Sequence, residues 1–292
     1  MATPVALIVN PAAGGGRAAA VLPDVEAALA AADVPFHTEL TTDLEHARAL
    51  ARAALAAGEP VATLGGDGLV GCVAGVLADT DGVLGVLPGG RGNDFARVLE
   101  IPKDPAAACA IIAAGHVRRL DLGDVDGRPF VGIASAGFDS ECNRIANETT
   151  FVKGNLVYAY SVPRALLEWK PARFELDLDG RERITYSGYS VACANSSAYG
   201  GGMYVAPDAK LDDGELDVVM TGRSPRRRFV LELPKVFKGT HVDSPAVHIM
   251  RAREIRVSAD RPFTMYADGD PIGDLPVTVR VRAAALNVLS PA

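Results

Sequence analysis

The first 120 residues alternate short apolar runs with longer segments in which apolar residues recur at helical spacing. The apolar runs are residues 5–9, 61–64 and 83–87, and the helical segments are 17–32, 45–57, 70–77 and 104–114. Strands that are buried on both faces of a parallel sheet read as continuous apolar runs, and helices connect them. The alternation therefore predicts a doubly wound α/β domain.

Beyond about residue 120 the pattern changes. A strand-like run at 130–137 ends at a glycine, and a helical stretch follows at 155–168. Segments of alternating apolar and polar residues then dominate, at 174–178, 186–194, 216–220, 255–258 and 277–281. Short turns separate them, which is typical of an antiparallel sheet or sandwich. We therefore expect an α/β domain over residues 1–120 and a mostly β, sandwich-like domain over residues 121–284.

Composition narrows the class of protein. Hydrophobic residues make up 49% of the 292 residues and glycine occurs 30 times, which indicates a folded, loop-rich globular protein. The net charge of −7 argues against a nucleic-acid binder. The four cysteines are scattered without a C-x₂-C pair, so we expect reduced thiols and neither a zinc site nor a disulfide framework. No signal peptide or run of roughly 20 apolar residues is visible. We expect a soluble, cytoplasmic protein whose membrane contacts are peripheral, at the inner membrane face.

The turn Gly65-Gly66-Asp67-Gly68 lies between an apolar run and a helical segment. Three glycines in four residues let the backbone reach φ > 0 and approach a ligand closely. Amide groups in such a turn, with the N-terminus of the following helix, form an anion site. The carboxylate of Asp67 suits a Mg²⁺ bridge or hydrogen bonds to loop amides. The alternative is a plain turn between a strand and a helix.

A second glycine-rich loop follows the run at 83–87. It contains Gly89, Gly90 and Gly92, and the Asn93-Asp94 pair stands at an expected helix N-cap. Loops that follow neighbouring parallel strands meet at the carboxyl edge of the sheet, where ligands bind in open α/β sheets. We therefore expect the two loops to lie side by side at one binding site.

A third loop, Gly14-Gly15-Gly16-Arg17-Ala18-Ala19, follows the first apolar run. It matches the G-x-G-x-x-G/A dinucleotide pattern, and Glu39 stands about 20 residues later, near the end of the next strand. A Rossmann dehydrogenase is therefore a competing interpretation. That interpretation leaves the two later glycine loops unexplained.

Together with Asn10-Pro11, these three loops resemble the diacylglycerol kinase catalytic family, which includes bacterial lipid kinases and sphingosine kinases. NAD kinases and 6-phosphofructokinases are more distantly similar. The resemblance implies an ATP- and Mg²⁺-dependent kinase, and a C-terminal end, residues 285–292, that packs back on the first domain. It implies that the nucleotide is bound by Asn10, Gly14, Gly16, Arg17, Gly65, Gly66, Asp67, Gly68, Gly89, Gly90, Gly92, Asn93 and Asp94.

The turn Asp268-Gly269-Asp270 lies between β segments and is compatible with a plain type I′ hairpin. The family has Asp-Gly-Glu here, so the resemblance implies that Asp268 is the general base, oriented by Asp270 and Asp121. This chain departs from the family in three ways. The Asn-Glu pair that commonly follows the central turn in relatives is absent, and two single residues differ. Asp270 stands where Glu is usual, and Leu69 stands where Thr usually follows the central turn.

Residues 206–217 resemble the segment in which the family holds a structural Mg²⁺. The resemblance implies the carboxylate of Asp213 and the carbonyl oxygens of Lys210 and Glu215 as ligands, and oxygen ligands are what Mg²⁺ prefers. The alternative is an acidic turn between strands.

Residues 224–238 combine an apolar stripe with a cluster of basic residues. The stripe comprises Phe229, Leu233, Val236 and Phe237, and the cluster comprises Arg226, Arg227, Arg228, Lys235 and Lys238. We expect the stripe to pack in the core. The basic residues are left open between a solvated face and contact with anionic lipid.

The sequence is therefore interpreted as an ATP-dependent lipid kinase of phospholipid metabolism, with diacylglycerol as the favoured acceptor. Its expected partner is a lipid at a membrane surface, and a homodimer is left open. Two alternatives remain. One is a kinase of a soluble substrate of the NAD or sugar-phosphate type, and the other is a non-catalytic nucleotide-binding regulator.

Overall fold

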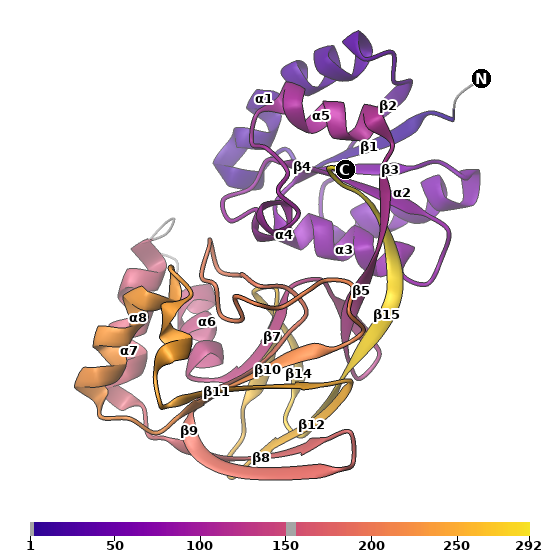
Figure 1. Cartoon of the computed structure of the whole chain (residues 1–292). Helices are drawn as coiled ribbons and strands as arrows, with labels where there is room; N and C mark the ends of the chain where they lie inside the picture. The colour runs from indigo at the N-terminus through magenta and orange to yellow at the C-terminus, as the bar shows by residue number, and fades with distance from the viewer. Residues whose placement is uncertain (1–2, 150–155) are drawn as a thin grey trace.

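The computed structural model describes residues 3–149 and 156–292. It shows two parts joined by long strands (Figure 1). The N-terminal part contains β1 (Val5–Val9), α1 (Ala13–Ala31), β2 (Phe36–Leu40), α2 (Leu44–Ala57), β3 (Val61–Gly65), α3 (Asp67–Leu77), β4 (Val83–Pro88), α4 (Asp94–Val98) and α5 (Pro105–Ala114). Its strands are parallel in the order β4-β3-β1-β2. Helices α1 and α5 pack together on one side of this sheet, and α2 and α3 pack together on the other. The predicted doubly wound α/β domain is thus confirmed.

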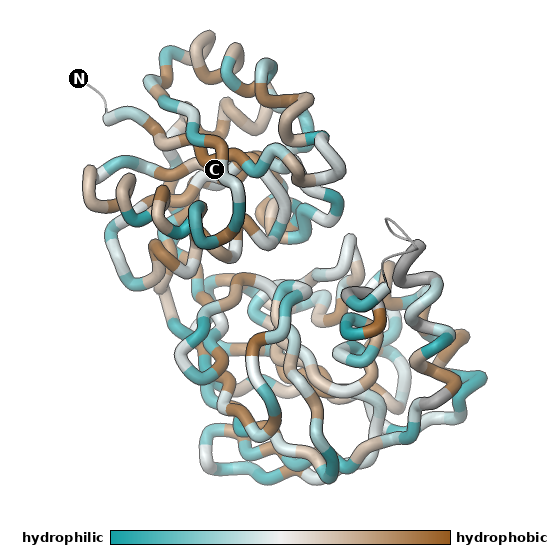
Figure 2. The backbone as a smooth tube through the Cα atoms, turned by 180° about the vertical axis from the view of Figure 1, so that it is seen from behind, coloured by the Kyte–Doolittle hydropathy of each residue, from teal (hydrophilic) through white to brown (hydrophobic). Residues whose placement is uncertain are grey.

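The buried strands account for the continuous apolar runs. Every residue of β1 and of β3 is buried, because helices cover both faces of the sheet. Hydrophobic segments run through the middle of this part, while many of its outward turns are hydrophilic (Figure 2). The helices bury small residues such as Ala47, Ala51 and Ala74, which lets them lie close to the strands.

The C-terminal part is mostly β, as predicted. Its strands are β5 (Val117–Val125), β6 (Arg128–Phe130), β7 (Ile133–Gly137), β8 (Ala172–Leu178), β9 (Glu182–Ala194), β10 (Leu216–Gly222), β11 (Val247–Ala252), β12 (Glu254–Ala259), β13 (Thr264–Ala267), β14 (Asp270–Asp274) and β15 (Val277–Leu289). Its helices are α6 (Phe138–Glu148), α7 (Leu156–Glu168), α8 (Arg226–Val236) and the short 3₁₀ helix η1 (Thr240–Asp243). Strands within this part pair antiparallel.

Two long strands connect the parts. β5 and β15 pair antiparallel along most of their length and run from one part into the other (Figure 1). At its end β15 also pairs parallel with β4, with Asn287 opposite Val83 and Val288 opposite Leu84. Leu286, Val288 and Leu289 are therefore buried in the core of the N-terminal part. Residue 120 falls within β5, and the proposed boundary there stays a prediction.

Two sequence-based expectations need correction, and a third is confirmed over the described residues. The run at 130–137 is two strands, β6 and β7, because the amides of Val131 and Gly132 between them point at the carboxylate of Asp268. Phe229 of the apolar stripe is buried, but Phe237 is 56% exposed because α8 ends at Val236. The predicted helix at 155–168 is α7, although its first residue lies outside the described residues. In the part of the chain that is described, no helix is long and apolar enough to cross a membrane.

Candidate active site between the two parts

The three glycine loops lie side by side at the carboxyl ends of β1, β3 and β4. This arrangement was predicted for the 65–68 and 89–94 loops, and the 14–19 loop joins them. The strand register places Val9 beside Leu64 and Gly65 beside Pro88. The loops also touch one another. A Cβ added to Gly14 would lie 2.6 Å from the carbonyl oxygen of Gly89, and one added to Gly90 would lie 2.4 Å from Cα of Gly66. Only glycine therefore allows this spacing between the backbones.

The conformations of the loops differ from the expectation at one point. Gly14, Gly15 and Gly16 all have positive φ, at 64°, 73° and 93°. By contrast, φ is not positive at the glycines of the 65–68 turn, because the turn enters α3 directly at Asp67. Its glycines are needed for close packing, as the contact with Gly90 shows. The first turn of α3 still presents amide groups that have no acceptor within the helix.

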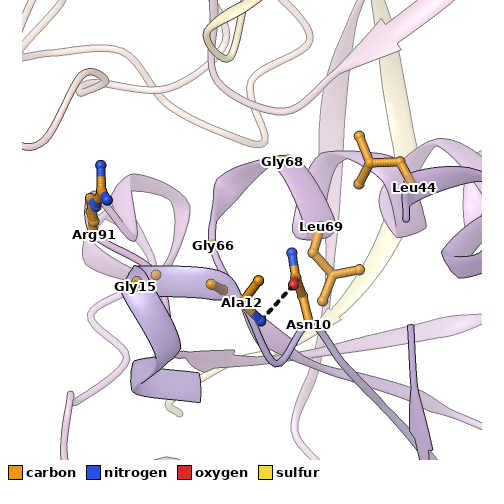
Figure 3. A pocket seen from close by; sticks show the side chains of 11 residues that line it. Asn10, Ala12, Gly15, Leu44, Gly66, Gly68, Leu69 and Arg91 are labelled. Atoms are coloured by element: carbon orange, nitrogen blue, oxygen red, sulfur yellow. Dashed lines mark hydrogen bonds between the residues drawn. The ribbon is translucent and has the colours of Figure 1, made fainter. Parts of the chain in front are cut away.

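A cavity of about 380 Å³ opens over these loops (Figure 3). It is lined by Asn10, Ala12, Ala13, Gly14, Gly15, Leu44, Gly66, Gly68, Leu69, Gly90 and Arg91. Asn10 shapes its floor, since Oδ1 accepts a hydrogen bond from the amide of Ala12 at 3.1 Å. Backbone amides and one guanidinium at the end of a sheet suit a polyphosphate.

Several residues of the cavity differ from the predicted set. Arg91 lines the cavity and is exposed, and it was not predicted although it stands between Gly90 and Gly92. Arg17 was predicted to bind the nucleotide, but its Nη1 donates to the carbonyl oxygen of Gly90 at 3.0 Å. Leu69 lines the cavity with a side chain that is 2% exposed and packs against Gly65.

The Asn93-Asp94 pair organises the loop and links the two parts. Asn93 is the N-cap residue of α4, but its side chain does not cap the helix. It closes the turn instead, accepting from the amide of Gly90 at 2.8 Å and donating to the carbonyl oxygen of Gly90 at 3.0 Å. Asp94 pairs with Arg97 and accepts a hydrogen bond from the amide of Gly201 at 2.7 Å. Asp94 thus connects α4 to a loop of the C-terminal part.

The carboxylate of Asp67 lies at the start of α3 and contacts the first turn of α4. Its Oδ1 accepts a hydrogen bond from the amide of Phe95 at 3.1 Å. Of the two predicted roles, the structure shows a hydrogen bond to a backbone amide, although the donor lies in the first turn of α4 and not in a loop. Burial raises the pKa of Asp67, and the nearby charge of Asp94 adds to the increase.

Asp268 occupies the turn between β13 and β14 in a left-handed conformation, with φ at 52°. Its carboxylate accepts hydrogen bonds from the amides of Val131 and Gly132, each at 2.9 Å, and of Ile133 at 3.3 Å. Gly132 permits this approach, since a Cβ there would lie 2.4 Å from Oδ1 of Asp268. The sequence gives no local signal for these amide contacts, because the three donors lie more than 130 residues from Asp268 along the chain.

Burial raises the pKa of Asp268 to about 6. The backbone hydrogen bonds oppose this increase, and the charge of Asp67 adds to it. The two carboxylates therefore interact across the boundary between the parts. Asp268 also lies against α3, since a Cβ on Gly71 would be 3.6 Å from its Oδ2.

A second cavity, of about 760 Å³, contains this carboxylate pair. It is lined by Asp67, Asp268 and Asp270 together with residues of α2, α3, β6 and β14. Leu44 and Gly68 line both cavities, so the two adjoin at the start of α3. Desolvation raises the pKa of Asp270 as well. The structure thus brings together the glycine loops and two of the three predicted catalytic residues.

Asp121, the third, lies elsewhere. It is 3% exposed, and its carboxylate accepts hydrogen bonds from the amides of Gly214 and Ala284, both at 2.7 Å. No hydrogen bond joins it to Asp268 or Asp270 among the residues described. Its orienting role stays a prediction, while its contacts tie β5 to β15 and to the 210–215 turn.

The predicted Mg²⁺ turn has a suitable oxygen atom and a competing cation. Oδ1 of Asp213 accepts from the amide of Glu215 at 3.2 Å, and its buried Oδ2 accepts no hydrogen bond. Nη1 of Arg251 lies 3.5 Å from that oxygen. Within 3–149 and 156–292, no group of three or more His, Cys, Asp or Glu side chains could hold a metal. A cation at Asp213 would therefore need backbone carbonyls, as predicted for Lys210 and Glu215, and the unsatisfied Oδ2 fits such a ligand set.

Comparisons with known proteins agree in family. Residues 4–125 match the model described as the diacylglycerol kinase catalytic domain, and residues 132–290 match the YegS C-terminal NAD kinase beta sandwich-like domain. A Mycobacterium tuberculosis protein named diacylglycerol kinase is 35% identical, over 98% of this chain and 95% of its own length. A Bacillus subtilis protein of the same name is 29% identical, over 77% of this chain and 75% of its own.

Two solved structures share the fold. A diacylglycerol kinase from Bacillus anthracis has a TM-score of 0.76 at 22% identity and covers 99% of this chain and 97% of its own. An NAD kinase from Archaeoglobus fulgidus, in complex with ATP, has a TM-score of 0.53 at 13% identity and covers 98% of this chain and 93% of its own.

Proposed function

The chain belongs to the diacylglycerol kinase catalytic family, and on that premise we propose that it transfers the γ-phosphoryl group of ATP to the hydroxyl of diacylglycerol. Membership of this family by itself supports a kinase activity. What we propose beyond that activity is the identity of the two substrates, a lipid as phosphoryl acceptor and ATP as donor. The observation that carries it is the position of Asp268, which faces Asp67 in a cavity adjoining the glycine loops.

The glycine loops support the phosphate part of the proposal. Phosphoryl transfer depends mainly on positioning and electrostatic stabilisation. The cavity over the loops offers the N-terminal turn of α3 and the side chain of Arg91. Arg17 contributes indirectly, since its hydrogen bond to the carbonyl oxygen of Gly90 joins the 14–19 loop to the 89–94 loop. The nucleotide phosphates would lie here, with the γ-phosphate toward Gly68, where the two cavities adjoin.

Asp268 is the proposed proton acceptor. A pKa of about 6 leaves its carboxylate mostly ionised at neutral pH, yet makes it a better base than an ordinary Asp carboxylate. The amides of Val131 and Gly132 fix its position. It would accept the proton of the lipid hydroxyl as the oxygen attacks the γ-phosphorus. Asp270 in the same cavity would help to orient that hydroxyl.

Mg²⁺ is part of the proposal, with two sets of residues that suit it. Bound with the nucleotide, Mg²⁺ would neutralise charge on the phosphate oxygens. Asp67 lies close enough to the loops to interact with such an ion or its water. At the 210–215 turn, Asp213 with the carbonyl oxygens of Lys210 and Glu215 would hold a structural ion.

An acceptor panel tests the function. The full chain is incubated with Mg²⁺, radiolabelled ATP and, separately, diacylglycerol, a sphingoid base, NAD and a sugar phosphate. Phosphatidic acid should be the labelled product. Label in NADP or in a sugar bisphosphate would overturn the lipid assignment and favour the soluble-substrate alternative. ATP binding without turnover on any acceptor would favour the regulator.

A further inference from the structure

Helix α8 lies beside α7 at the outer edge of the C-terminal part (Figure 1). Its inner face is packed. Phe229 is buried, and Leu233 packs with it in a cluster that includes Trp169 and Tyr189. Nη2 of Arg226 donates to the carbonyl oxygen of Trp169 at 2.7 Å, which ties the start of α8 to the residue just after α7. The helix is therefore fixed in place, and its outer face is rigidly presented.

The outer face of α8 combines exposed apolar and basic side chains. Leu231 is 74% exposed and Val230 is 43% exposed. Arg227 and Lys235 on the helix, and Lys238 just beyond it, are also exposed. Over the described parts of the chain, no ion pair involves any of these three cations. On the neighbouring helix, Leu167 is 78% exposed.

The carboxylate of α8 does not neutralise this face. Glu232 is 16% exposed, and it is held by Nε of Arg228 at 3.0 Å and by the hydroxyl of Ser244 at 3.0 Å. Among the described residues, Arg227, Lys235 and Lys238 thus form no direct ion pair, in a chain whose net charge is −7. We define the α8 surface as Arg227, Val230, Leu231, Lys235 and Lys238.

We propose that the α8 surface docks the protein on an anionic lipid bilayer. Helices that lie in the membrane interface combine basic residues with exposed apolar side chains, as this surface does. Exposed cations complement anionic headgroups, and the exposed side chains of Val230 and Leu231 can insert among the acyl chains. Neither cavity of the candidate active site includes α8, so the surface is free to bind while the site is occupied. The proposal rests on the proposed function only in that a diacylglycerol acceptor resides in a bilayer.

Sedimentation of the full chain with vesicles tests the docking directly, without ATP. The vesicles are phosphatidylcholine with and without phosphatidylglycerol. Binding should require phosphatidylglycerol and should weaken as NaCl is added. The triple variant Arg227→Glu, Lys235→Glu, Lys238→Glu should lower the partition coefficient by about 100-fold or more, because each basic residue contributes a factor of about five at an anionic surface. Leu231→Ala should lower it by up to about tenfold.

A matched triple variant controls for total charge. Lys103→Glu, Arg119→Glu and Arg181→Glu change the net charge equally at exposed cations on other elements. This control should retain binding within about fivefold. The docking proposal would be overturned if both triple variants lost vesicle binding equally, or if binding did not depend on phosphatidylglycerol. If the α8 triple variant does not fold, the single variants Lys238→Glu and Leu231→Asp carry the same test.

Kinase assays separate this proposal from the proposed function. The α8 triple variant should phosphorylate a water-dispersed short-chain diacylglycerol at the wild-type rate and lose activity on diacylglycerol in anionic vesicles. Wild-type protein that phosphorylates neither acceptor would contradict the proposed function, and the sedimentation result would still decide the docking. Loss of short-chain activity in a folded α8 variant would contradict the docking role, because the surface would then serve the site.

Discussion

At the level of single residues, Asp268 combines two properties that a proton acceptor needs. Backbone amides hold its carboxylate in one position, and burial raises its pKa to about 6. A carboxylate with the same three amide contacts at the surface would have its pKa lowered, not raised. Burial therefore dominates here, with the charge of Asp67 as a smaller contribution in the same direction.

Replacing this carboxylate should separate catalysis from binding. Asp268→Asn keeps the shape and removes the basicity, so kcat should fall by roughly 10²–10⁴-fold, the range for loss of a general base. ATP affinity should change little, because the glycine loops belong to the other part of the chain. Initial rates and ATP titrations measure the two effects. Asp270→Asn is the comparison variant and should lower kcat by less than Asp268→Asn does. Near-native turnover in Asp268→Asn would rule out the role of Asp268 as the base.

The raised pKa also predicts how activity depends on pH. Because Asp268 must be ionised to accept a proton, kcat/KM should fall about tenfold per pH unit below pH 6. The stability contribution of Asp268 has the opposite sign. Its folded pKa of about 6 exceeds the ordinary value of 3.8, so the folded state binds the proton first and gains stability as the pH falls from 6 to 4.

Activity at pH 5 should therefore be low in a protein that is still folded. Thermal melts at pH 7 and pH 5 serve as the control for the pH–rate profile. A profile that stays flat to pH 5 would show that Asp268 does not titrate in the catalysed step. A parallel loss of activity and folded structure would assign the acid limb to unfolding.

At the level of elements, the three glycine loops form one packed unit. Gly90 is the contact point, because a Cβ there would lie 2.4 Å from Cα of Gly66 and 2.9 Å from Oδ1 of Asn93. Gly68 is in the same region, yet a Cβ there meets nothing within 4 Å. The two positions make a matched pair.

Gly90→Ala should force the 89–94 loop away from the 65–68 turn. We expect a lower melting temperature and ATP affinity reduced beyond detection, by calorimetry on the folded protein. Gly68→Ala should keep or raise the melting temperature, since alanine is favoured over glycine in a helix by about 1 kcal/mol. If both variants melt like the wild type, the loops do not depend on contact at Gly90.

The 210–215 turn poses a test of metal against guanidinium. If Mg²⁺ completes the coordination of Asp213, the wild type should melt higher in Mg²⁺ than in EDTA, and Asp213→Ala should abolish that difference. Asp212→Ala is the control, since Asp212 pairs with Arg118 at 2.9 Å on the surface. If Asp213→Ala lowers the melting temperature equally in Mg²⁺ and in EDTA, the carboxylate stabilises the turn through its contacts with Arg251 and Glu215 and not through a metal.

At the level of the whole molecule, β5 and β15 join the two parts, and the end of β15 belongs to the N-terminal core. Leu286 is 1% exposed there. Leu286→Ala should therefore destabilise the protein by about 2–5 kcal/mol. Leu40→Ala, at a position that is 53% exposed, should change stability by less than about 0.5 kcal/mol. Chemical denaturation measures both, and a Leu286→Ala variant as stable as the control would contradict the packing of the chain end.

Much of the fold could be predicted because its signals are local. Continuous apolar runs appear as the buried strands β1, β3 and β4, and the segments at helical spacing appear as α1, α2, α3 and α5. The glycine loops could be placed together because parallel strands direct their carboxyl ends to one edge. The conformation of each glycine could not be predicted, because positive φ and close packing both favour glycine. Gly15 requires the first and Gly90 the second.

The contacts that make the site depended on tertiary structure. The sequence by itself determined the strand and helix pattern, the loop edge and the residue types of the site. Asp268 meets its amide donors at Val131 and Gly132 across 137 and 136 residues of chain, and Arg17 reaches Gly90 across 73. No local pattern specifies such partners, because they are brought together by sheet pairing and by burial in a shared core. The same burial raises the pKa of Asp268, so only the folded chain decides which aspartate can act as the base.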